Sequence, residues 1–274
     1  MVRWLSSLAL EPLYPFAFVV LERIPGTDLR HELASMTGTQ MTVLAARIVD
    51  VQRRVASLEL GAGFGWRPLG EVGAFSSWQA VVGRDLEAGI RRLETLRETK
   101  LITRIVDLGR SLEIYFSSVQ PTCFLDDLTT KNVIVQNGEL RGLVDFDVVC
   151  YGDPLYWLST SCLSLTIERS NLNRPTGVRT TYLTRNSEVL RFLAERKNGV
   201  GRYLALTRAA VKVDVGPSGQ PYLDMLEQFW AVDDFGRQVL GLYTVVHIMD
   251  FARFETDAQK LERLLGLIQI QATT

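Results

Sequence analysis

Two carboxylates and one amide stand in the middle of the sequence at a spacing that suits phosphoryl transfer. Asp127 precedes Asn132 by five positions, and Asp145 follows a short apolar run. Sites that move a phosphoryl group use one Asp to accept or orient the proton of the acceptor hydroxyl, and an Asn and a second Asp to hold Mg²⁺. The order carboxylate, amide, strand, turn, strand, carboxylate is therefore typical of such a site.

The segment between Asn132 and Asp145 is predicted to be a β-hairpin. Val133-Ile134-Val135 is β-branched, and Asn137-Gly138 follows it. Asn-Gly between two such runs is a strong hairpin signal, because a tight turn needs positive φ. The hairpin would bring Asp145 back beside Asn132, where the two side chains could bind Mg²⁺ while a nucleotide supplies further oxygens. An ordinary surface hairpin with polar ends is the alternative interpretation.

The sequence around these residues resembles the aminoglycoside phosphotransferase family, a protein-kinase-like group. Residues 124–135 resemble its catalytic loop, and Val144-Asp145-Phe146 is similar to its metal-binding segment. Gly152-Asp153-Pro154 resembles its Gly-Asp-Pro signature, and residues 18–26 resemble the last N-lobe strand and hinge. The resemblance implies an α+β fold: a mostly helical, protein-kinase-like C-lobe with a catalytic hairpin and a residual hinge strand.

The resemblance also implies a function. The chain would be an ATP-dependent phosphotransferase that acts on a hydroxyl of a small molecule with Mg²⁺. Asp127 would be the catalytic residue, and Asn132 and Asp145 would be the metal ligands. The backbone around Glu22 and Ile24 would contact the adenine of ATP.

The chain departs from the family close to Asp127. Leu125 stands where the family usually has His, and Asp126 stands where it usually has a small residue. Neighbouring carboxylates can exchange roles, but only Asp127 has the right spacing to Asn132. We expect Asp153 to hold the loop structurally rather than to contact substrate.

The start of the sequence predicts that most of the nucleotide-binding lobe is missing. Kinase-like enzymes cover the phosphates with a Gly-rich loop and hold them with a strand Lys. Residues 1–17 contain no Gly, and the first Lys is Lys100. We therefore expect a residual N-lobe strand and hinge at residues 1–26, a helical C-lobe at residues 27–274, and weak phosphate transfer. The alternative function is a non-catalytic C-lobe that binds a small ligand or a partner.

Composition is that of an enzyme-sized protein without a nucleic-acid or membrane partner. The 274 residues are 47% hydrophobic, the formal net charge is -1, and no uninterrupted apolar run is long enough for a membrane span. The three cysteines lack C-x-x-C spacing and indicate a reduced, cytoplasmic protein. A third interpretation takes Asp145-Phe146-Asp147 as the metal-binding motif of a glycosyltransferase, but no alternating βα pattern accompanies it.

Helix-spaced apolar residues predict the remaining elements. His247 is expected to be a core residue. Asp250 and Asp233-Asp234 could line an acceptor pocket, although acidic helix positions are usually solvated. The expected helices span residues 47–57, 78–97, 102–116, 188–196, 202–211, 222–230, 235–254 and 258–270.

Overall fold

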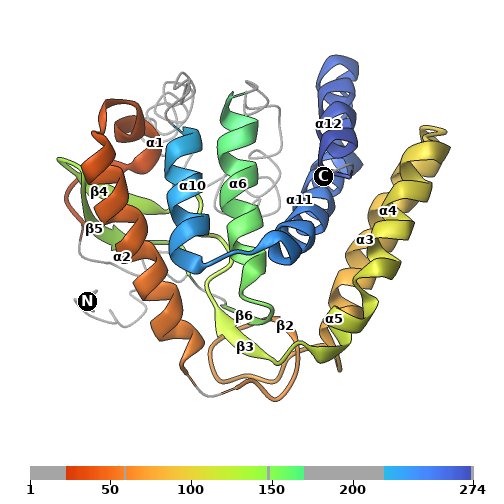
Figure 1. Cartoon of the computed structure of the whole chain (residues 1–274), viewed down its shortest axis with the longest axis horizontal. Helices are drawn as coiled ribbons and strands as arrows, with labels where there is room; N and C mark the ends of the chain where they lie inside the picture. Colours follow the sequence, from red (N-terminus) through yellow and green to blue (C-terminus); the bar gives the residue numbers. More distant parts are fainter. Residues whose placement is uncertain (1–22, 59, 147–148, 170–218, 273–274) are drawn as a thin grey trace, which may run out of the picture.

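The computed structural model describes residues 23–58, 60–146, 149–169 and 219–272, and it shows a helical body that holds two small sheets (Figure 1). This mixture of helices and short antiparallel strands confirms the predicted α+β class. The helices are α1 (Leu29–Glu32), α2 (Gly38–Ala56), α3 (Trp78–Thr95), α4 (Thr99–Ser111), α5 (Glu113–Ser118), α6 (Leu155–Arg169), α10 (Gly219–Trp230), α11 (Asp234–Phe254) and α12 (Ala258–Gln271), with a 3-10 turn at Leu33–Ser35.

Both sheets are three-stranded and antiparallel. The first has the order β1-β4-β5 and contains the predicted hairpin, and the second has the order β2-β6-β3. The strand that leads into the candidate catalytic loop, β3, therefore belongs to one sheet, and the strand that leaves it, β4, belongs to the other. The strands are β1 (Thr27–Asp28), β2 (Gly65–Arg67), β3 (Thr122–Phe124), β4 (Val133–Gln136), β5 (Glu139–Leu143) and β6 (Val149–Gly152).

The predicted hairpin is confirmed. Strands β4 and β5 pair from Val133 opposite Leu143 to Gln136 opposite Glu139. The two turn residues both lie in the left-handed region, with φ of 56° at Asn137 and 77° at Gly138. Asn and Gly adopt this conformation more readily than other residues, which explains why the sequence marks the turn so clearly.

The turn of the hairpin is attached to the helices beside it. The Gly138 backbone N–H donates to Glu32 Oε2 at 3.1 Å. The side chain of Gln40 donates from Nε2 to the Asn137 carbonyl at 3.0 Å. Gln40 also closes a capping box with Thr37 at the start of α2. These bonds attach the turn of the hairpin to α1 and α2 and so fix its position on the helical body.

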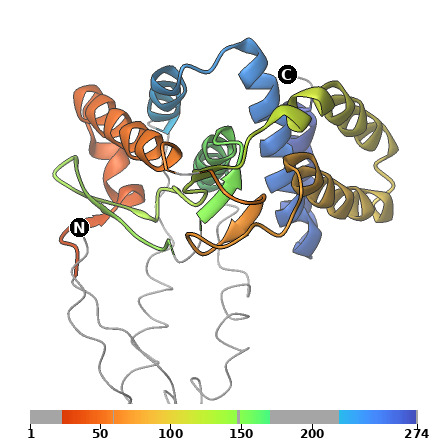
Figure 2. The ribbon, with the colours of Figure 1, turned by 90° about the horizontal axis from the view of Figure 1, so that it is seen from below.

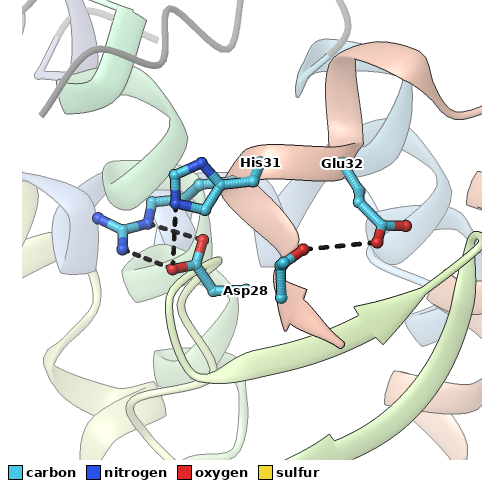
Figure 3. Close-up of polar contacts among 5 residues, drawn as sticks. Asp28, His31 and Glu32 are labelled. Carbon is cyan, nitrogen blue, oxygen red and sulfur yellow. Dashed lines mark hydrogen bonds and ion pairs between the residues drawn. The ribbon is translucent and has the colours of Figure 1, made fainter. Parts of the chain in front are cut away.

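A second set of contacts joins β1 to α1 (Figure 3). Asp28 Oδ2 accepts from Arg30 Nη2 at 2.8 Å, and His31 Nε2 lies 3.6 Å from the same oxygen. The Thr27 hydroxyl donates to Glu32 Oε1 at 3.4 Å. Glu32 therefore bridges β1 and the hairpin turn with its two oxygens. The result is a rigid connection between the first described strand and the strand that follows Asn132.

The centre of the molecule is helical. Helix α11 packs against α3, α6 and α12, while α10 packs against α2 and α6. Figures 1 and 2 show α6 and α11 between α2 on one side and α3 and α4 on the other. None of the helices in the described part of the chain has the length and apolar character needed to cross a membrane.

A buried polar network joins these helices around Asp153. Its carboxylate accepts from Tyr115 Oη at 2.7 Å and from Tyr243 Oη at 2.6 Å. The indole of Trp78 donates to Tyr243 Oη at 2.7 Å. Burial raises the pKa of Asp153, and the two tyrosine bonds oppose that rise. All these contacts are internal, which agrees with the structural role expected for Asp153.

Some expected boundaries differ from the observed ones. The single helix predicted over residues 102–116 is wrong, because the chain forms α4 and α5 with a break at Leu112. Leu112 is buried at this break, so the apolar pattern continues through a turn that brings Phe116 into the core. Helix α2 begins earlier than expected, at the capping box of Thr37. The helices expected at residues 188–196 and 202–211 and the start of the chain through residue 22 lie outside the described residues.

Candidate active site

The loop between β3 and β4 holds Asp127 and Asn132 together. Asn132 Nδ2 donates to Asp127 Oδ2 at 2.8 Å and to the Asp127 carbonyl at 2.9 Å. The backbone N–H of Asn132 donates to the Thr129 carbonyl at 2.9 Å, which closes a tight turn between them. Asn132 is buried, whereas the Asp127 side chain is 39% exposed. The five-residue spacing thus produces a carboxylate that is anchored at one edge and open at the other.

Asp145 comes directly after β5, near the same loop. The Val144 backbone N–H donates to the Asn132 carbonyl at 3.0 Å, so pairing continues beyond the ends of the two strands. Asp145 itself has a φ of 70°, in the left-handed region. Non-glycine residues seldom adopt this conformation, and such positions concentrate at functional sites. The hairpin therefore delivers Asp145 to the loop of Asp127, as the order of the motif predicts.

A cavity of about 960 Å³ opens beside these residues, and Asp126, Asp127 and Asp145 line it. Asn132 is not among the lining residues and lies behind Asp127. The opposite walls come from α3 and α11, which contribute Arg84 and Asp85, and Asp250 and Arg253. Of the acidic helix positions considered for a pocket, Asp250 lines this cavity, whereas Asp233 and Asp234 do not. The cavity is charged and of a size that suits a small polar molecule.

The two neighbouring carboxylates have different surroundings. The indole N–H of Trp66 donates to Asp126 Oδ2. Burial raises the pKa of Asp126, the Trp66 bond opposes this shift, and the charge of Asp127 adds to it. Asp126 is thus occupied by a structural contact, while Asp127 keeps an exposed edge. This difference favours Asp127 over Asp126 as a candidate base.

The donor set fits a magnesium ion that is bound together with phosphate. Both hydrogen bonds of the Asn132 side chain within the described residues are donated by Nδ2, which leaves Oδ1 as an acceptor. Asp145 adds a carboxylate on the cavity wall. No three His, Cys, Asp or Glu side chains converge as a metal site among the described residues. One carboxylate and one amide suit Mg²⁺, which keeps several water or phosphate ligands.

Of the two residues expected near the adenine, the structure describes only Ile24. Glu22 lies outside the described residues. Ile24 is half-buried, and its side chain packs against Gly142 of β5 so closely that a Cβ at Gly142 would collide with it. Ile24 therefore contacts the hairpin that leads to Asp145. Its contact with a nucleotide stays a prediction.

Sequence reasoning missed the residues that α3 and β2 contribute. The Arg84 guanidinium lies 5.5 Å from the Trp66 ring centroid and 5.0 Å from that of Phe75, and its Nε donates to Asp85 Oδ1 at 2.7 Å. These residues are more than forty positions from Asp127 and share no motif with it. No local pattern in the sequence marks them, because they reach the cavity only through the packing of α3 and β2.

His247 packs within the core, as expected, but it is only partly buried because its ring also lines the cavity. Its Nε2 lies 3.1 Å from Thr160 Oγ1, and its ring centroid lies 4.5 Å from that of Tyr156. Burial lowers the pKa of His247 to about 4, and a hydrogen bond with the Tyr156 backbone opposes that shift. The imidazole is therefore neutral at pH 7, so it contributes no charge to the cavity.

This burial predicts a pH-dependent stability. The folded state binds the His247 proton more weakly than the unfolded state. The contribution of His247 to the free energy of unfolding is therefore fully present above the unfolded pKa of about 6.5. It is lost as the pH falls from there toward 4. For this group alone, we expect the free energy of unfolding to fall by about 3 kcal/mol over that range. Denaturant unfolding at a series of pH values measures this loss.

The matched variants are His247→Gln and His31→Gln, since His31 is a partly exposed histidine outside the cavity. The wild type and His31→Gln should share one pH profile, and His247→Gln should lose much of the fall below pH 6.5. Parallel profiles for all three proteins would contradict the assignment.

Comparisons with known proteins agree with the resemblance found in the sequence. A thermostable mutant of aminoglycoside phosphotransferase APH(4)-Ia, in a ternary complex with AMP-PNP and hygromycin B, aligns with a TM-score of 0.54. The alignment has 11% identity and covers 92% of this chain and 70% of that chain. The apo form of a thermostable mutant of the same enzyme has 15% identity, covers 93% of this chain and 72% of that chain, and gives a TM-score of 0.45.

At such identities the likeness concerns the fold, which is that of a kinase-like phosphotransferase. No curated protein sequence matches this chain significantly. The sequence model of the phosphotransferase enzyme family, APH, matches residues 2–195, which is most of the chain. The protein therefore belongs to the APH phosphotransferase enzyme family.

Proposed function

We propose that this protein transfers the terminal phosphoryl group of ATP to a hydroxyl of a small molecule, with Mg²⁺. The observation that supports the proposal most is the position of Asp127. Its carboxylate is anchored by Asn132 at 2.8 Å and lines the same cavity as Asp145. A base, an amide and a second carboxylate in one place are the protein groups that this reaction needs.

Asp127 would accept or orient the proton of the acceptor hydroxyl. The Asn132 side chain donates to Oδ2 of Asp127 and makes no hydrogen bond to Oδ1 of Asp127. A positioned carboxylate of this kind directs the hydroxyl oxygen toward the phosphorus and receives its proton as the new bond forms. Lys131 Nζ lies 4.0 Å from Asp127 Oδ2, which places a positive charge beside the carboxylate.

Asn132 and Asp145 would hold the metal. Mg²⁺ bound with ATP supplies neutralisation of the charge that develops on the terminal phosphates. The amide oxygen of Asn132 is available because Nδ2 makes both bonds to Asp127. The Val144 backbone N–H donates to the Asn132 carbonyl at 3.0 Å, which ties the residue before Asp145 to Asn132. The backbone of Glu22 and Ile24 would contact the adenine.

The acceptor would be a small hydroxylated molecule that binds in the cavity. Five Asp and two Arg side chains line the cavity, together with the aromatic rings of Trp66, Tyr156 and Phe251. Such a wall offers hydrogen bonds to hydroxyl and amino groups and flat apolar surface to a ring. The structurally similar enzyme was crystallised with hygromycin B, which supports this kind of acceptor. Neither a nucleic acid nor a membrane is needed as a partner, and we propose a cytoplasmic location, where ATP is supplied.

The test is phosphate transfer from ATP across a panel of aminoglycosides, sugars and amino alcohols, with product detected by mass spectrometry. We expect one class of acceptor to gain a phosphoryl group with Mg²⁺ and none to do so when the metal is chelated. If no compound of the panel is phosphorylated, but the protein binds nucleotide or an acceptor in a calorimetric titration, the alternative of a non-catalytic ligand-binding protein is favoured.

A further inference from the structure

The loop that carries Asp127 is fixed by side chains from outside the loop. Leu125 stands where the family usually has a histidine, and its leucine side chain cannot form a hydrogen bond within the loop. The described structure instead supplies three external contacts, one to each of residues 125, 126 and 128. They come from α2, β2 and α6, which are separate elements of the fold.

The first contact is a clamp on the backbone of Leu125. Gln52, on α2, is fully buried, and its Nε2 donates to the Leu125 carbonyl at 2.5 Å. Its Oε1 accepts from the Leu125 backbone N–H at 3.1 Å. One side-chain amide thus pairs with both polar groups of one residue, as a neighbouring strand would. Because an unsatisfied buried polar group costs about 1–3 kcal/mol, this pairing strongly fixes the peptide planes on both sides of Leu125.

The other two contacts lie on either side of Asp127. Trp66 donates from its indole to the Asp126 carboxylate. Ser161, on α6, is buried and donates from Oγ to the Leu128 carbonyl at 3.0 Å. Leu128 is itself buried, so its carbonyl has little access to water. The residues before and after Asp127 are therefore held, while the Asp127 side chain keeps its exposed edge.

We infer that Gln52 and Ser161 are positioning residues for Asp127, an inference that rests on the proposed function. They act through the backbone of Leu125 and Leu128 and do not line the cavity. A misplacement of about 1 Å in a reacting group can cost roughly 10²-fold in rate, so the placement of this backbone decides the rate of the chemical step. Binding of ATP should depend on it much less.

Ser161→Ala provides the sharpest test because the same helix contains a matched control. Ser159 is also fully buried in α6, but its hydroxyl donates to the Tyr156 carbonyl of its own helix at 2.6 Å. Ser159→Ala therefore removes an equally buried hydroxyl that does not touch the loop. Gln52→Met, which keeps the length of the side chain and removes the clamp, is the second variant.

Hydrogen exchange followed by mass spectrometry reads the loop without any assay of activity. We expect amides in residues 122–132 to exchange roughly five- to tenfold faster in Ser161→Ala, the effect of about one net hydrogen bond. They should keep the wild-type rate in Ser159→Ala. In the transfer assay, kcat of Ser161→Ala should fall about ten- to hundredfold while KM for ATP stays within about twofold. Gln52→Met should show a larger change in the same direction.

Unchanged exchange of residues 122–132 in both Ser161→Ala and Gln52→Met would overturn the inference. Equal losses of kcat in Ser161→Ala and Ser159→Ala would overturn it as well, because the effect would then be one of general stability. A wild-type protein that phosphorylates no acceptor would count against the proposed function, and the exchange comparison would still decide whether these side chains hold the loop.

Discussion

Asp127→Asn is expected to lower kcat for phosphate transfer by about 10²–10³-fold, with little change in KM for ATP. The amide has the size and shape of the carboxylate and can still accept from Asn132 Nδ2, which now lies 2.8 Å from Oδ2. Only the basicity and the charge are removed. General base catalysis contributes about 10²–10⁴-fold, and that contribution is what the substitution deletes.

The matched control is Asp126→Asn, which makes the same change one position earlier. Asp126 receives the Trp66 indole N–H, and an amide oxygen can accept that bond equally well. We expect a loss of less than about tenfold for this variant, since neutralising a structural carboxylate leaves its hydrogen bond intact. Initial rates at saturating ATP and acceptor measure both variants. A greater loss in Asp126→Asn than in Asp127→Asn would assign the base to Asp126.

Asp145→Asn should reduce kcat/KM for ATP by about 10²–10³-fold and raise the Mg²⁺ concentration needed for half-maximal rate. The substitution removes one of the two oxygen ligands proposed for the metal, and the loss of a preorganised electrostatic contact commonly has an effect of this size. Folding should be preserved because φ at this position is 70°. Asn adopts the left-handed conformation at least as readily as Asp does.

Asp250→Asn is the control for Asp145, because Asp250 also lines the cavity but lies on α11. It should leave the Mg²⁺ dependence at its wild-type value, although the KM for the acceptor can change. Turnover measured over a magnesium titration at fixed ATP separates the two variants. The same half-saturating Mg²⁺ in the wild type and Asp145→Asn would remove Asp145 from the metal site.

The candidate catalytic loop and its hairpin could be predicted because their signals are local. Asn137-Gly138 specifies a turn with two positive φ values, and those values are 56° and 77°. The β-branched run at 133–135 specifies the strand before it, and the turn fixes the pairing next to it, up to Val135 opposite Leu140. Beyond that pair an irregularity between Ile134 and Val135 shifts the register, so that Ile134 lies opposite Gly142. The spacing of Asp127 and Asn132 likewise needs only one short turn. Helices α3, α10 and α12 follow from periodic apolar residues in the same local way, whereas α11 is a long apolar run that is buried on most sides.

The tertiary structure alone decided what surrounds the loop. Arg84 and Asp85 reach the cavity from α3, and His247 and Asp250 reach it from α11, through the packing of two helices that are distant in sequence. Helix periodicity shows which face is buried, but it does not show which partner that face meets.

The contacts that hold Asp127 are equally non-local. Gln52 is separated from Leu125 by 73 positions, and Ser161 from Leu128 by 33. A buried Gln or Ser in a helical pattern resembles a surface residue in the sequence, because only the fold shows which backbone groups it meets. The sequence by itself thus determined which residues we propose for phosphoryl transfer. The packing of α2, α3, α6 and α11 decided how those residues are held and what kind of cavity they face.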